Sequence, residues 1–148
     1  MDAITSQVLR SKVSSLIEEM HYHFYRSGYS TIIRESRDFS CVILDREGRL
    51  IVAPPMFFHA PVYRHLVGRI LATHGAAGEI NEGDVFVSNH PYEGGLPHVS
   101  DMAFIAPVFA DGRIVAFSGS IAHKADVGGA APGSTSATAT EIYHEGIL

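Results

Sequence analysis

The 148-residue sequence lacks several features, and each absence excludes a class of protein. It has no run of about 18 apolar residues, which a membrane-spanning helix requires. Its start lacks the basic and apolar blocks of a secretory signal, and one cysteine, Cys41, cannot form an internal disulfide. With 11 Lys and Arg against 16 Asp and Glu, it shows no basic face for nucleic acid. We therefore expect a cytoplasmic protein that binds neither membranes nor nucleic acids, with Cys41 as a buried, unreactive thiol.

Histidine and glycine are abundant, with 9 and 14 residues, and 46% of the sequence is hydrophobic. This composition predicts one domain with a single core and a site built on loops. Residues 124–140 are rich in Gly, Ala, Ser and Thr and show no apolar periodicity. A loop of this length is uncommon in a compact domain unless it is functional or completed by another part. We therefore expect residues 1–148 to be a piece of a larger protein or a subunit of a complex.

Apolar residues at helical spacing predict two helices. The first covers residues 4–27, and Gly28 after it can cap the helix in the left-handed conformation. The second covers residues 62–74, with Pro61 in its first turn and Gly75 as its stop. The buried stripe of the first helix is expected to contain Val13, Leu16, Ile17, Met20 and Phe24.

The remaining apolar runs predict strands. They are a hairpin over residues 39–53, a short buried strand over 85–87, and a second hairpin formed by 102–109 and 113–122. Gly48 supplies the turn of the first hairpin, and Pro54-Pro55 ends it because proline cannot donate to a ladder. Helices and strands mix without regular βαβ alternation. The expected fold class is therefore α+β, a mostly antiparallel sheet with flanking helices, in which an N-terminal helix precedes the β-hairpins.

Histidine and aspartate recur at both ends of the second predicted hairpin. His98 and Asp101 form an H-x-x-D pair at its start, and His123 and Asp126 form another after its end. Because an antiparallel hairpin places the start of its first strand beside the end of its second, Asp101 and His123 should be neighbours. Imidazole nitrogens and carboxylate oxygens bind zinc, manganese or iron. His98, Asp101 and His123 are therefore candidate metal ligands, although histidines that bond backbone carbonyls at strand ends would explain the spacing equally well.

Two acidic residues in the same loops, Glu93 and Asp126, are candidate catalytic bases or metal partners. The glycine pairs Gly94-Gly95 and Gly128-Gly129 stand close to them in sequence. Backbone amides of such pairs can hold a phosphate, but neither pair matches the Walker pattern. Tight turns around the site are the favoured interpretation of both pairs.

Several motifs in a fixed order make the chain similar to a known family. They are Arg37-Asp38-Phe39-Ser40-Cys41, Gly83-Asp84-Val85-Phe86, Asn89-His90-Pro91-Tyr92, Gly94-Gly95, His98-Val99-Ser100-Asp101, and the segments 122–129 and 140–146. Together with the opening helix, they resemble the beginning of the hydantoinase B/oxoprolinase family over nearly the whole chain. The chain departs from the family at His90, where Asp is common, and at Leu96-Pro97, which lengthen the G-G-T-H motif by one residue. These departures bear on substrate specificity and leave the metal-ligand positions intact.

The resemblance implies a metal-containing subunit of an ATP-dependent amidohydrolase that opens hydantoins, 5-oxoproline or lactams. It implies that His98, Asp101 and His123 bind a divalent metal. ATP would be bound by a hydantoinase A-type partner subunit in a hetero-oligomer, and the isolated chain would be inactive. Family members are several hundred residues long, so residues 1–148 would form an N-terminal portion. The alternatives are a subunit of an ATP-dependent ketone carboxylase of the acetone or acetophenone type, and a non-catalytic assembly module.

Overall fold

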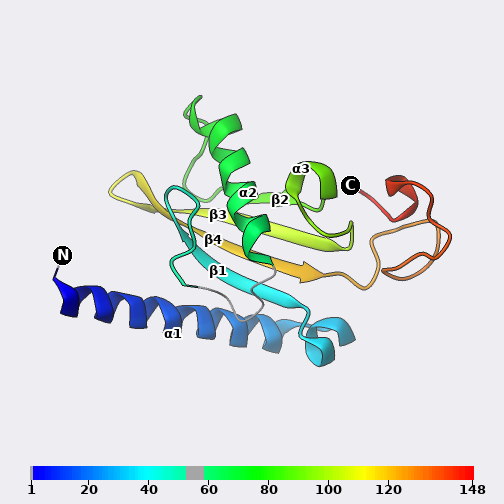
Figure 1. Ribbon diagram of the computed structural model, residues 1–148, viewed down its shortest axis with the longest axis horizontal. Coiled ribbons are helices and arrows are strands. Elements are labelled where there is room, and N and C mark those ends of the chain that lie inside the picture. Colours follow the sequence, from blue (N-terminus) through cyan, green and yellow to red (C-terminus); the bar gives the residue numbers. More distant parts are fainter. Residues whose placement is uncertain (1, 53–58) are drawn as a thin grey trace.

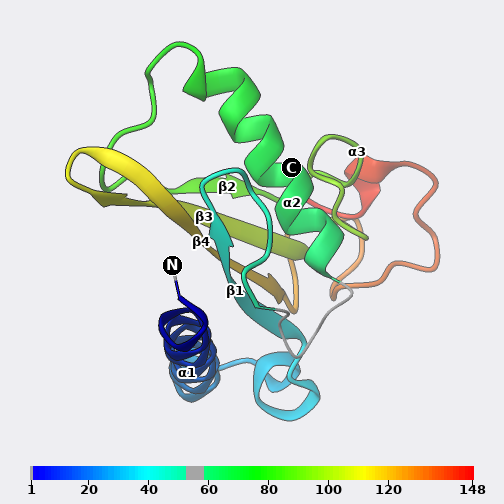
Figure 2. The ribbon, with the colours of Figure 1, turned by 60° about the vertical axis from the view of Figure 1, so that its left-hand side comes forward.

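A computed structural model describes residues 2–52 and 59–148, which form a four-stranded antiparallel sheet with a helix against each face (Figure 1). The strand order is β1-β4-β3-β2. The elements are α1 (Ala3–Ser27), β1 (Phe39–Asp45), α2 (Ala60–Ile70), β2 (Phe86–Ser88), α3 (Pro91–Gly94), β3 (Asp101–Ala110) and β4 (Arg113–His123). Figure 2 shows α1 nearly end-on beside β1, with α2 across the opposite face of the sheet. The predicted α+β class is confirmed.

The β3–β4 hairpin forms the centre of the sheet, and both of its predicted strands are present. Asp111 and Gly112 make its turn with φ of 51° and 71°, the left-handed values that two-residue hairpin turns require. The register then pairs the first residue of β3 with the last residue of β4, Asp101 with His123. A β-bulge between Val108 and Phe109 shifts the register by one residue, so the pairing of Asp101 with His123 depends on this bulge as well as on the turn.

The first predicted hairpin is largely wrong. β1 pairs along its whole length with β4, from Phe39 opposite Ala122 to Asp45 opposite Ala116. The returning segment contributes an isolated bridge between Leu44 and Leu50, although Gly48 does make the turn with φ of +80°. Pairing with the central β4 buries β1 between two layers, which a two-stranded hairpin cannot do. The predicted end of that hairpin at Pro54-Pro55 lies outside the described residues.

α1 begins at its N-cap Asp2, whose carboxylate accepts a hydrogen bond from the Thr5 amide at 2.9 Å. Its apolar stripe is only partly as predicted, because the helix packs against β1 and leaves Leu16 46% exposed while Ile17 is buried. Gly28 follows the helix with φ of −71°, so its predicted left-handed conformation is wrong. Glycine is required there for space, since a side chain at Gly28 would collide with Ile33.

α2 supplies the main core on the other face of the sheet. Pro61 lies in its first turn as predicted, and the chain continues beyond Ile70 as one π-helical turn that ends at Gly75. The core residues buried between α2 and the sheet include Val62, Tyr63, Leu66, Val67 and Ile70 of the helix and Val42, Leu44, Ile105, Phe117 and Ile121 of the strands. Among the described residues, no helix combines the length and the hydrophobicity that a membrane-spanning segment requires.

β2 and Cys41 give opposite outcomes for two burial predictions. β2 is an edge strand, and Val85 and Val87 are 61% and 60% exposed, so the prediction of a buried strand is wrong. Phe86 alone of its apolar residues packs against the α2 core, because successive side chains point to opposite faces. Cys41 is buried on the α1 side as predicted, and burial raises the pKa of its thiol to about 12.

Candidate metal centre

Two segments of the sheet bring His98, Asp101 and His123 together. His98 lies in the turn before β3, where the Asp101 amide donates to the His98 carbonyl at 3.2 Å, and His123 ends β4. His98 Nε2 lies 3.4 Å from Asp101 Oδ2, and His123 Nδ1 lies 3.1 Å from Asp101 Oδ1. The two imidazole rings are 4.6 Å apart between centroids. The prediction that these three side chains converge is confirmed.

The geometry fits a metal ion. One ligand atom from each of the three residues lies within 4.8 Å of the other two, the one such group in the described part of the chain. Ligands at bond lengths of about 2.0–2.2 Å are separated by roughly 3–4 Å, so small side-chain movements suffice for binding. The Asp101 side chain is 2% exposed and that of His98 is 35% exposed. The group is therefore anchored in the protein and open on the side of His98, where water or a substrate can approach.

The charge of Asp101 is set by the surrounding histidines. Burial by itself raises the pKa of this carboxyl, whereas the neighbouring imidazoles of His59, His98 and His123 lower it. The net effect holds the pKa of Asp101 below its ordinary value. Asp101 is therefore ionised at neutral pH, the form in which a carboxylate binds a metal ion.

Two further residues lie next to the centre and were not identified as site residues from the sequence. Asp38 precedes β1, and its Oδ2 lies 3.8 Å from His123 Nδ1, so it can offer another oxygen. Its carbonyl also accepts from the His123 amide at 3.1 Å. His59 precedes α2, is buried, and places Nε2 3.7 Å from Asp101 Oδ2. Recognition of the β1–β4 pairing would have indicated Asp38, but no spacing pattern marks His59.

Asp126, the second candidate base, organises the loop that follows β4. Its carboxylate accepts hydrogen bonds from the amides of Gly128 at 2.7 Å and Gly133 at 3.0 Å, and these bonds lower its pKa. A β-carbon at Gly129 would lie 2.7 Å from the Glu145 carbonyl oxygen, which leaves room for glycine alone. The loop and the segment after it therefore pack closely, which agrees with the tight-turn interpretation of this glycine pair.

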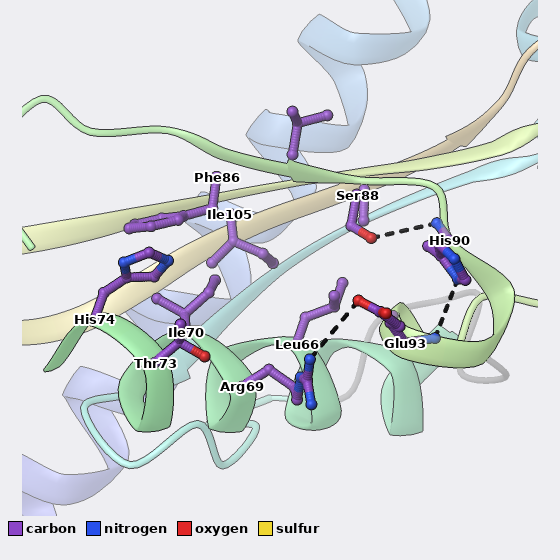
Figure 3. Close-up of a pocket in the computed structure, with 13 residues that line it drawn as sticks. Leu66, Arg69, Ile70, Thr73, His74, Phe86, Ser88, His90, Glu93 and Ile105 are labelled. Atoms are coloured by element: carbon purple, nitrogen blue, oxygen red, sulfur yellow. Dashed lines mark hydrogen bonds and ion pairs between the residues drawn. The ribbon is translucent and has the colours of Figure 1, made fainter. Parts of the chain in front are cut away.

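Glu93, the other candidate base, lies on α3 at the rim of a separate pocket of about 290 Å³ (Figure 3). Its carboxylate lies 3.8 Å from the Arg69 guanidinium of α2, and both side chains are exposed. Its amide donates to His90 Nδ1 at 3.2 Å, which caps the short helix. Ile70 and Phe86 line the interior of this pocket, and in the described chain none of the three candidate ligands lines it. The structure thus groups Glu93 with Arg69 and His90.

Comparison with known proteins identifies the family. Residues 2–148 match the family described as Hydantoinase B/oxoprolinase. The chain therefore belongs to the hydantoinase B/oxoprolinase family, as its motifs predicted.

Named relatives show the kind of protein in which such chains occur. The chain is 35% identical to 5-oxoprolinase 1 of Arabidopsis thaliana over 98% of its own length and 11% of the relative's. It is 33% identical to a protein of Pseudomonas sp. strain NS671 that is named as the putative B-type subunit of a D-/L-hydantoinase, over 99% of its length and 25% of the relative's. It thus spans between about a tenth and a quarter of these relatives.

Solved structures show the same fold. The ATP-dependent caprolactamase from Pseudomonas jessenii is 26% identical with a TM-score of 0.74, over 99% of this chain and 25% of the other. A nucleotide-free acetone carboxylase has a TM-score of 0.82 at 18% identity, over 90% of this chain and 18% of the other. At that identity the second likeness is one of fold alone.

Proposed function

We propose that this chain forms the metal-binding part of an ATP-dependent enzyme that hydrolyses cyclic amides such as hydantoins, 5-oxoproline or lactams. The observation that carries the proposal is the convergence of His98, Asp101 and His123 in one buried but open group. Membership of the family and the names of the relatives support the kind of reaction. Zinc, manganese and iron all accept this set of two imidazoles and one carboxylate.

The residues of the chain have distinct parts in this proposal. Asp101 would supply the one negative charge among the three ligands, and its lowered pKa keeps it ionised at neutral pH. His98, the most exposed member of the three, would lie on the side of the site from which the substrate approaches. A divalent ion bound by such a set lowers the pKa of coordinated water and polarises a carbonyl group. Asp126 and Glu93 stay predictions as proton-transfer residues.

We propose that ATP is bound by a separate hydantoinase A-type subunit. The Pseudomonas relative is named as one subunit of a hydantoinase, which supports a heteromeric assembly, and the caprolactamase is named as ATP-dependent. Neither glycine pair of this chain has the Walker spacing. ATP would activate the amide by phosphorylation in the partner, and the activated species would be attacked at the centre formed by this chain.

The first experiment tests the metal centre in the 148-residue chain. The purified chain is incubated with Zn(II), Mn(II) or Fe(II), dialysed, and analysed for bound metal. We expect about one ion per chain, lost in Asp101→Asn and retained in Asp111→Asn. Asp111 is a matched control because it is exposed in the turn at the opposite end of the same hairpin. Equal metal content in the two variants, or none in the parent chain, would refute the centre.

The second experiment tests the reaction. The chain is combined with a hydantoinase A-type subunit, and ADP release is measured with hydantoin, 5-oxoproline, caprolactam, or acetone with bicarbonate. ADP release that depends on a cyclic amide and is lost in Asp101→Asn supports the proposal. Release that depends on acetone and bicarbonate would instead identify a ketone carboxylase. Metal binding without ADP release on any of these substrates would favour an assembly module.

A further inference from the structure

A buried network of polar side chains extends from the candidate metal centre into the core on the α2 side of the sheet. His59 Nε2 lies 3.7 Å from Asp101 Oδ2, and His59 Nδ1 lies 2.9 Å from Ser40 Oγ. Ser40 Oγ is in turn 2.8 Å from the Tyr63 hydroxyl, which also lies 2.9 Å from the Ser40 carbonyl oxygen. Ser40, His59 and Tyr63 are fully buried, and Asp101 is 2% exposed. The four residues come from β1, from the residue before α2, from α2 and from β3.

The direction of the hydrogen bonds among Tyr63, Ser40 and His59 bears on whether His59 Nε2, the ring nitrogen that faces Asp101, carries a proton. If the Tyr63 hydroxyl donates to Ser40 Oγ, the Ser40 hydroxyl donates to Nδ1 and the proton of a neutral His59 lies on Nε2. If Tyr63 instead donates to the Ser40 carbonyl, the Ser40 hydroxyl can donate to Nδ1, which again leaves the proton of neutral His59 on Nε2, or to Tyr63, in which case Nδ1 carries a proton. Neutral His59 would then turn a lone pair toward the Asp101 carboxylate, which is unfavourable in a buried site. A protonated Nε2 avoids this repulsion in either arrangement.

We propose that His59 is a positioning residue for Asp101, presenting its Nε2 proton to Oδ2 and fixing the carboxylate between His98 and His123. This inference rests on the proposed metal centre. Carboxylates that bind metals are commonly held by further hydrogen bonds, and loss of such a partner typically weakens metal binding about 10- to 100-fold. His59 is suited to the role because it is rigidly placed, with its side chain 1% exposed.

Packing against the sheet holds Tyr63, the residue of this network that is farthest from Asp101 along its contacts. The Tyr63 ring lies against Gly119 of β4, where a β-carbon would come within 2.8 Å of ring atoms Cδ1 and Cε1. Tyr63 therefore cannot shift toward the sheet, and its hydroxyl holds Ser40 through both the hydroxyl and the carbonyl oxygen. Ser40 then fixes the His59 ring through Nδ1. The orientation of Asp101 is thus linked to the packing of α2 on the sheet.

The test measures Zn(II) affinity of the 148-residue chain by competition with a chromophoric chelator, with near-UV circular dichroism as the folding control. We expect His59→Leu to weaken zinc binding about 10- to 100-fold. His59→Gln, whose amide N–H can replace the donor, should recover most of this loss. His23→Leu is the matched control, because His23 is exposed on α1 and pairs with Glu19. A folded His59→Leu with parental affinity, or a His59→Gln as weak as His59→Leu, would overturn the proposal.

A second readout is independent of metal and of the leucine variant. Nitrogen-15 NMR of the metal-free parent chain reports which ring nitrogens of His59 carry protons. A protonated Nε2 supports the inference, and an unprotonated Nε2 overturns it even if His59→Leu fails to fold. If the parent chain bound no zinc, the metal centre would be wrong, while the NMR result would still decide whether His59 Nε2 carries the proton that the inference requires.

Discussion

Replacing Gly119 by alanine tests the packing that supports the candidate metal centre. The added β-carbon would lie 2.8 Å from two atoms of the Tyr63 ring and 3.0 Å from Val42 Cγ2. Tyr63 and Val42 are both fully buried, so neither can move into solvent. Overpacking of this kind costs about 1–3 kcal/mol, whereas alanine in place of glycine within a strand recovers about 0.5–1 kcal/mol. We expect Gly119→Ala to lower the free energy of unfolding by about 1–2 kcal/mol.

Gly68→Ala is the matched control, because it adds the same methyl group on α2 where nothing lies within 4 Å of the new β-carbon. Alanine in an exposed helix position is favoured over glycine by about 1 kcal/mol, so this variant should be more stable than the parent chain. Thermal unfolding followed by circular dichroism measures both. For a domain of this size each kcal/mol shifts Tm by about 2–4 °C, so the two variants should move Tm in opposite directions. A Gly119→Ala protein that unfolds at or above the parental Tm would refute the packing argument.

Three further predictions concern the centre and its surroundings. Asp101→Asn should lower zinc affinity far more than Asp126→Asn, because Asp101 faces both histidines whereas Asp126 binds loop amides. Metal content after dialysis measures this difference, and the reverse order would show the ligand assignment to be wrong. Cys41 should react very slowly with a disulfide reagent at pH 8 in the native chain and quickly in denaturant, because its raised pKa of about 12 leaves a thiolate fraction of about one in ten thousand. Fast native labelling would contradict its burial. The 148-residue chain alone should not hydrolyse 5-oxoproline with ATP and metal, and sustained ADP release by it would show that no partner subunit is needed.

Much of the candidate centre could be predicted because its parts lie at the ends of one hairpin. The bounds of the two strands place Asp101 beside His123, and the register that pairs them depends on the Asp111-Gly112 turn together with a β-bulge between Val108 and Phe109. His98 follows because it stands three residues before Asp101 in a tight turn. The helices were predicted for a similar reason, since apolar spacing within α1 and α2 is a local property. Family motifs then supplied the chemical interpretation of these positions.

The errors arose where pairing is decided by burial across the chain. The segment after Gly48 looked like the partner of β1, but β4 covers β1 along its full length and the neighbouring segment adds a bridge at Leu50. The edge position of β2 exposes Val87, although its apolar composition predicted burial. The role of Glu93 as a base stays a prediction; the structure shows only that its helix directs it to Arg69 at a separate pocket (Figure 3).

The sequence by itself determined the central hairpin, the two helices and the meeting of His98, Asp101 and His123, because turn residues and periodic spacing act over short distances. Only the tertiary structure decided which other groups reach the centre. The pairing of β1 with β4 places Asp38 beside His123, and the packing of α2 on Gly119 places Tyr63, Ser40 and His59 behind Asp101. These contacts join segments far apart in the chain, and they depend on which surfaces the whole fold buries together rather than on any local pattern of residues.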